Sequence, residues 1–109
     1  MSEFRVYSGA TLVGTSNLEY GDPPMGVAFG RFFPVAAYAS IQAQCASNHD
    51  DQTNLHLSVA VPSGEIIQCA AVGILDCGGD IEVNVLGISY PFYAELFPQH
   101  VAQYEASLK

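Results

Sequence analysis

One run of residues offers the side chains that a divalent metal ion prefers. His49, Asp50 and Asp51 are consecutive, and His56 follows within the same polar region. Imidazole nitrogens and carboxylate oxygens together suit a divalent cation. The run lacks the D-x-[DN]-x-[DN]-G spacing of an EF-hand calcium loop. We therefore interpret it as a solvated loop and predict neither a metal nor another cofactor, with a metal-binding or small-ligand domain as an alternative.

A second group of carboxylates surrounds one predicted turn. Asp76, Asp80 and Glu82 lie close together in the sequence, and paired carboxylates can perform acid–base hydrolysis of a neutral sugar. Substrates that carry phosphate or carboxylate also need a cation in the site, and this region has none. A minor hydrolase therefore remains an alternative. We interpret these acids as solvated residues at turns and strand edges.

The cysteines do not form a recognisable catalytic or redox set. Cys77 lies beside Asp76 in a predicted turn, and a neighbouring acid favours the neutral thiol. His100 could approach Cys77 only through the tertiary fold. Cys45 and Cys69 lie in apolar surroundings, and the three cysteines include no C-x-x-C pair. With an N-terminus unlike a signal peptide, this pattern predicts reduced thiols, a cytoplasmic protein and no catalytic set.

The charge of the chain excludes several classes of partner, whereas no motif identifies one. The chain of 109 residues has 11 acids and three bases, a formal net charge of −8, and no lysine or arginine from Phe32 to Leu108. DNA and RNA binding requires clustered bases that displace counterions, so we expect no nucleic-acid partner and no anionic membrane partner. The chain also has no apolar run long enough to cross a bilayer.

Alternating apolar and polar residues predict the strands, which we expect at residues 4–8, 11–18, 27–33, 55–61, 65–75 and 81–85. Pro34 fits the first position of a helix over residues 35–47, with Tyr38, Ile41 and Cys45 as its buried stripe. The run 65–75 is apolar on both faces, which is typical of a central strand or of a strand that meets a partner. Short loops favour an antiparallel meander.

Pro98 is expected to begin the last helix, which continues to Ser107 with Val101, Tyr104 and Leu108 on one side. The order becomes β-β-(β)-α-β-β-β-α. The sequence therefore predicts one α+β domain over residues 1–109, with a mostly antiparallel sheet of about five strands and two helices on one of its faces.

The hypothesis that fits these features best is an acidic domain that binds a basic protein, such as an inhibitor or immunity protein. Long-range attraction would steer the association, and tyrosines would anchor the contact. We predict that the contact surface includes Asp50, Asp51, Asp76, Asp80 and Glu82, with Tyr20 or Tyr90 as anchors. A homo-oligomer, such as a homodimer that buries the apolar run 65–75 and the neutral helix 35–47, is a further alternative.

Overall fold

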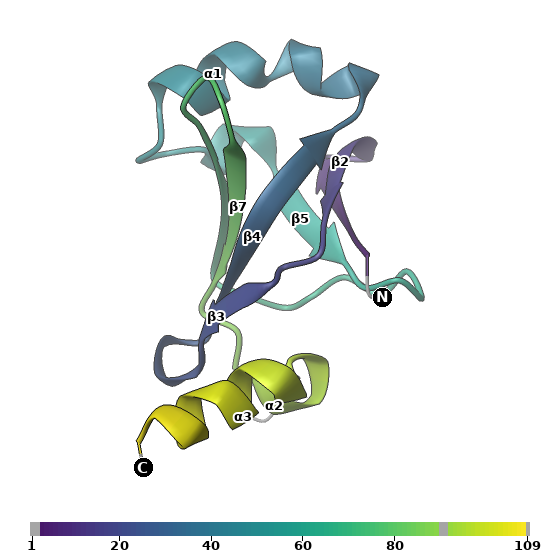
Figure 1. Ribbon diagram of the computed structural model, residues 1–109. Coiled ribbons are helices and arrows are strands. Elements are labelled where there is room, and N and C mark those ends of the chain that lie inside the picture. The colour runs from purple at the N-terminus through teal and green to yellow at the C-terminus, as the bar shows by residue number, and fades with distance from the viewer. Residues whose placement is uncertain (1–2, 90–91, 109) are drawn as a thin grey trace.

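The computed structural model describes residues 3–89 and 92–108, which form one curled antiparallel sheet with short helices at its two ends (Figure 1). The predicted α+β class is confirmed, with seven strands where about five were expected. The strands are β1 (Phe4–Ser8), β2 (Thr11–Ser16), β3 (Tyr20–Asp22), β4 (Val27–Pro34), β5 (Leu57–Ala60), β6 (Ala71–Asp76) and β7 (Ile81–Leu86). The helical segments are η1 (Pro23–Met25), η2 (Ala36–Ser40), α1 (Gln42–Ser47), η3 (Thr53–Leu55), α2 (Phe92–Leu96) and α3 (Pro98–Ser107).

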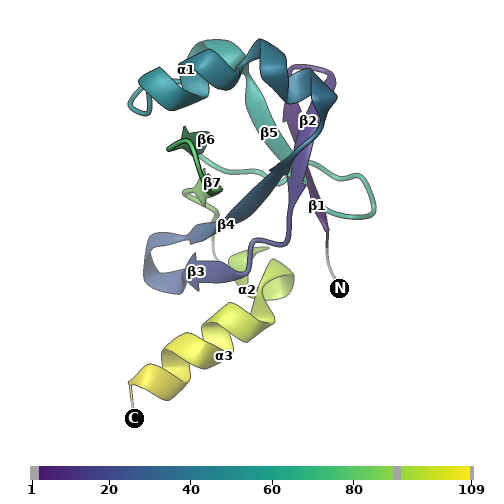
Figure 2. The same cartoon turned by 45° about the horizontal axis from the view of Figure 1, so that its top comes forward.

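The strands follow the order β5-β1-β2-β4-β7-β6, and β3 is an additional neighbour of β4. Each pairing is antiparallel. Figure 2 shows how the sheet curls, so that the strands at the two ends of this order, β5 and β6, come close to each other. The fold is therefore an incompletely closed barrel rather than a flat sheet.

The first two predicted strands are confirmed, and β1 and β2 pair as an antiparallel hairpin. Gly9 takes the left-handed conformation (φ 59°) in its turn. The register shifts between Val6 and Tyr7, which leaves Val13 as the extra residue of a β-bulge next to Gly14. A side chain at Gly14 would collide with the ring of Phe32, so this glycine lets β2 approach β4 closely.

The long helix expected over residues 35–47 is wrong in its first half. Pro34 ends β4 instead of starting a helix, because the next residue, Val35, still donates its N–H to Val13 O at 2.9 Å. A short 3-10 turn, η2, follows, and α1 begins at Gln42. Pairing with β2 thus overrides the local preference for helix.

The central strand expected over residues 65–75 is also corrected. Residues 65–70 carry only an isolated bridge between Ala60 and Ile66, and β6 begins at Ala71. β6 lies at the end of the strand order, whereas β7 lies inside it. β5 pairs with β1, so β5, β6 and β7 do not form the expected meander.

The helices occupy both ends of the curled sheet and not one face of it. Figures 1 and 2 place η2 and α1 at one end and α2 and α3 at the other. α3 begins at Pro98 as predicted, but its buried residue is His100, while Tyr104 and Leu108 are exposed. None of the helices in the described part of the chain is long and apolar enough to cross a bilayer.

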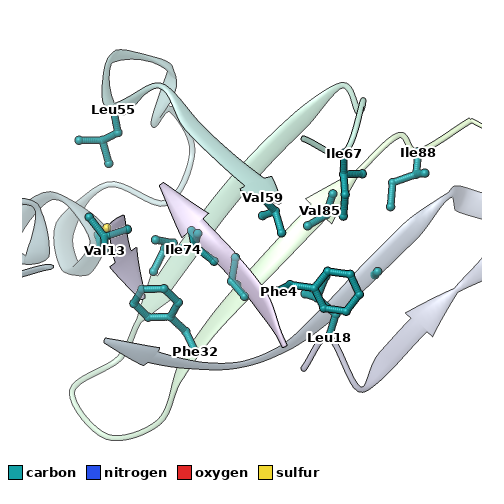
Figure 3. Close-up of a cluster of buried hydrophobic side chains, with 14 of the residues drawn as sticks. Phe4, Val13, Leu18, Phe32, Leu55, Val59, Ile67, Ile74, Val85 and Ile88 are labelled. Atoms are coloured by element: carbon teal, nitrogen blue, oxygen red, sulfur yellow. The ribbon is translucent and has the colours of Figure 1, made fainter. Parts of the chain in front are cut away.

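The hydrophobic core fills the interior of the curl. Figure 3 shows Phe4 of β1 and Val59 of β5 in one buried cluster with Ile74 of β6 and Val85 of β7. These four side chains are at most 4% exposed. The core therefore joins the two ends of the strand order and holds the curl together.

Candidate functional site

Three of the five acids predicted for the contact surface are exposed near the end of the molecule that carries α1. Asp50 and Asp51 lie in the loop after α1, and Asp80 lies in the β6–β7 turn, which reaches the same end (Figure 1). Asp51 accepts hydrogen bonds from Thr53, through Oγ1 at 2.6 Å and through the main-chain N–H at 3.1 Å. These bonds lower the pKa of Asp51, so its charge persists in mild acid.

Asp76 does not belong to this exposed surface, because only 4% of it is accessible to solvent. Tyr38 donates its hydroxyl proton to Asp76 Oδ2 at 2.7 Å, and the Gly78 N–H donates to Oδ1 at 3.0 Å. Gln42 Nε2 lies 3.5 Å from the same carboxylate. The hydrogen bond from Tyr38 is the main cause of a lowered pKa for Asp76. The expectation of a solvated acid is therefore wrong at Asp76, which joins η2 and α1 to β6.

Burial raises the pKa of the Tyr38 phenol and of the Cys45 thiol beside it. Tyr38 therefore stays a hydrogen-bond donor to Asp76 well into the alkaline range. Burial also raises the pKa of Cys69. Cys45 is buried, Cys69 is partly buried and Cys77 is exposed, each as a free thiol.

The remaining acids of the β6–β7 hairpin already have partners. Asp80 Oδ1 lies 3.2 Å from Arg31 Nη2, an ion pair in which both side chains are exposed to solvent. It is the one ion pair among residues 3–89 and 92–108. Glu82 is partly buried and accepts a hydrogen bond from Asn84 Nδ2 at 3.2 Å. Asp50 and Asp51 are thus the exposed acids of this end that have no cationic partner in the described structure.

The two predicted tyrosine anchors are not brought to the acidic end. Tyr20 is 59% exposed and stacks on Phe29 with 5.5 Å between ring centroids. It belongs to β3, which lies beside α3 at the opposite end (Figure 1). Tyr90 falls outside the described residues. The predicted site is therefore divided, with acids at one end and Tyr20 at the other.

His49, Asp50, Asp51 and His56 do line one groove, of about 290 Å³, between the loop after α1 and residues 70–73. Within the part of the chain that the structure describes, no three His, Cys, Asp or Glu side chains converge as metal ligands. The groove therefore gathers the polar residues without giving them the geometry of a metal site.

Cys77 and His100 do not form a catalytic pair. Cys77 lies in the β6–β7 turn near α1, whereas His100 is in α3 at the other end of the molecule. His100 is 3% exposed; its Nε2 lies 2.8 Å from Leu18 O, and its ring stacks on Phe97. Its Nδ1 is buried and has no hydrogen-bond partner among the described residues. The geometry gives His100 a structural role, that of fixing α3 to the segment before β3.

A larger groove, of about 500 Å³, lies between residues 61–68 and α2. Its lining includes two half-exposed apolar residues, Ile66 and Phe92, and two acids, Glu65 and Glu95. No sequence motif predicted this groove. One signal was present at the adjacent apolar pair Ile66-Ile67, because neighbouring residues of an extended chain face opposite sides and cannot both face one core.

Comparisons with known proteins give no further assignment. No protein-family model matches the chain, and neither curated proteins nor solved structures provide a significant match.

Proposed function

We propose that this chain is a binding module for a basic protein, as an inhibitor or immunity protein would be. The observation that carries the proposal is the exposed pair Asp50 and Asp51 in a molecule of net charge −8. Bases that could neutralise them are absent from the sequence between Phe32 and Leu108. Complementary charge of this kind raises the rate of association with a cationic surface.

The form of the acidic loop supports this role. Asp51 accepts two hydrogen bonds from Thr53, and the Asp51 N–H donates to Asn48 Oδ1 at 3.2 Å. These local bonds hold the loop in one conformation while the carboxylates stay in solvent. A loop that is ordered before binding loses less conformational entropy on association.

The exposed acids are accessible to a partner's guanidinium groups, whereas Asp76 is buried and already accepts hydrogen bonds from Tyr38 and Gly78. A partner's arginines could form bidentate pairs with Asp50 or Asp51, whereas Asp80 would first have to release Arg31. The proposed contact therefore centres on the loop after α1.

The test is affinity capture from the organism that encodes the chain, followed by measurement with the purified retained protein. We expect a basic protein whose association rate constant falls at least about tenfold between about 0.02 and 0.15 M salt. A retained protein of acidic or neutral charge, or an association rate that does not respond to salt, would contradict the proposal.

A further inference from the structure

The groove between residues 61–68 and α2 exposes Ile66 because the main chain around it is fixed. Ile67 donates its N–H to Val59 O, and Val61 donates to Glu65 O, both at 2.8 Å. This pairing places Ile67 in the core, with 6% of it exposed, and turns Ile66 outward, with 54% exposed. Neighbouring residues of an extended chain face opposite sides, so Ile66 cannot turn inward without displacing Ile67.

Phe92 is exposed for a similar reason. Tyr93 and Phe97 are completely buried, and Tyr93 donates its hydroxyl proton to Val27 O at 2.8 Å. α2 thus presents Tyr93 to the core and leaves Phe92 on its outer side, with 50% exposed. Two large apolar side chains from separate elements therefore face water in one groove, an arrangement that is typical of interaction sites.

The charges of this groove select the occupant. Glu65 and Glu95 line it, and its remaining lining residues are uncharged. A second copy of the chain is a poor occupant, because each copy has a net charge of −8 and few bases to offer. An occupant that complements the groove has an apolar side chain that packs on Ile66 and Phe92. It also has cationic side chains that pair with the two glutamates.

We propose that this groove binds a short segment of the basic partner, in which apolar residues are flanked by arginine or lysine. The inference rests on the proposed function and adds a second contact to it. The apolar side chains fill the space between Ile66 and Phe92, and the flanking cations pair with Glu65 and Glu95. The groove should therefore prefer a segment that has both apolar and cationic residues over a segment that has only one of the two.

A direct test uses three synthetic peptides and the isotope-labelled full chain, observed by NMR. The probe is acetyl-Arg-Leu-Leu-Arg-amide, and the controls are acetyl-Arg-Ser-Ser-Arg-amide and acetyl-Glu-Leu-Leu-Glu-amide. We expect amide shifts at residues 65–68 and 92–96 and an affinity for the probe at least about tenfold above either control. Equal binding of both arginine peptides, or shifts confined to residues 49–53, would overturn the proposal.

Matched variants identify the groove as the binding site. Phe92→Ser and the double variant Glu65→Gln/Glu95→Gln should each weaken the probe about tenfold or more. The control Glu3→Gln/Glu105→Gln removes the same charge from two exposed acids outside the groove, and it should stay within about twofold. The amide spectrum of each variant verifies folding. Equal losses in the groove variants and the control would contradict the proposal.

The captured partner separates the two proposals. If it binds with a strong salt dependence but Phe92→Ser and Glu65→Gln/Glu95→Gln leave its affinity within about twofold, the groove proposal fails and the proposed function stands. If no basic protein is captured, the proposed function fails, and the peptide titration still decides whether the groove has the stated preference. A dimer in sedimentation that Phe92→Ser dissociates would make a second copy the occupant and overturn the groove proposal.

Discussion

The side-chain amide of Gln52 hydrogen-bonds both main-chain groups of Ile74. Gln52 Nε2 donates to Ile74 O, and Ile74 N–H donates to Gln52 Oε1, each at 2.7 Å. These are the two bonds that a neighbouring strand would make with a residue at the edge of a sheet. Gln52, which is 7% exposed, therefore stands in for a strand at the free edge of β6.

Replacing Gln52 should lower stability substantially. In Gln52→Ala both buried main-chain groups of Ile74 lose their partner, and we expect the free energy of unfolding to fall by about 2–4 kcal/mol. Urea denaturation measures the loss. Gln103→Ala, at an exposed position of α3, is the control and should change stability by less than about 0.5 kcal/mol. Equal effects of the two variants would show that the bonds to Ile74 contribute nothing.

A charge at position 52 should make this bond pair sensitive to pH. An ionised glutamate in Gln52→Glu can accept from Ile74 N–H but faces Ile74 O without a proton to donate. Protonation restores the donor, so the difference in unfolding free energy from the parent should shrink as the pH falls from neutral to about 4. A difference that stays constant over this range would contradict the pairing.

The hydrogen bond from Tyr38 to Asp76 should make the free energy of unfolding depend on pH in the acid range. The pKa of Asp76 is lower in the folded state than its ordinary value of 3.8, so the bond's contribution is complete above that value and is lost as the pH falls through the folded-state pKa. Tyr38→Phe should therefore cost about 1–2 kcal/mol at neutral pH and less at about pH 3.

NMR titration of the Asp76 carboxyl group checks the cause, because its pKa should rise in Tyr38→Phe. Tyr104→Phe is the matched control, since Tyr104 is exposed on α3. An Asp76 pKa that is unchanged by the loss of the Tyr38 hydroxyl would refute this explanation.

The exposed acids should act on the rate of association. Asp50→Asn/Asp51→Asn removes two charges, while the side-chain amide oxygen introduced at position 51 can still accept the hydrogen bonds from Thr53. With the captured basic partner, we expect the association rate constant to fall about two- to tenfold at low salt and to converge with the parent at high salt. Stopped-flow fluorescence measures both. Glu3→Gln/Glu105→Gln has the same net charge and should retain most of the parent's rate; an identical decrease would point to net charge alone.

The space that Gly14 leaves for the neighbouring strand should be important for stability. A Cβ there would lie 2.6 Å from Phe33 O and would also collide with the Phe32 ring. Gly14→Ala should therefore lower the free energy of unfolding by about 2 kcal/mol or more, as measured in urea. In the Gly14→Ala variant, adding Phe32→Leu should lower the free energy of unfolding by less than Phe32→Leu does in the parent, because the smaller side chain relieves the collision. Gly79→Ala, which meets no atom within 4 Å, is the control and should be nearly neutral.

Local signals were sufficient for part of the fold. Alternation over Phe4–Ser8 predicted β1, and Pro98 predicted the start of α3, because both depend on neighbours in the sequence. The pairing of β5 with β1 depends on residues far apart in the chain, so the expected meander was wrong. Pro34 was misassigned for the same reason, since Val35 bonds to Val13 across the sheet.

The candidate site was predicted less well. Composition and charge predicted Asp50 and Asp51 as exposed acids, but no local pattern distinguishes them from Asp76. Asp76 is buried and accepts a hydrogen bond from Tyr38, which lies 38 positions away in the sequence. No local pattern in the sequence marks Gln52, because its partner Ile74 is 22 positions away. Ile66 did have a local signal, because Ile66 and Ile67 are adjacent apolar residues of an extended chain and cannot both face one core.

The loop after α1 and the groove beside α2 lie toward opposite ends of the molecule. Their separation sets the minimum length of a peptide that could contact both. The molecule measures 44 Å along its longest axis. An extended chain advances about 3.3 Å per residue, so a peptide that reaches from one contact to the other needs on the order of ten residues. If both proposals hold, a single partner needs two basic regions separated by a comparable distance, either on a folded surface or at the two ends of an extended segment of that length.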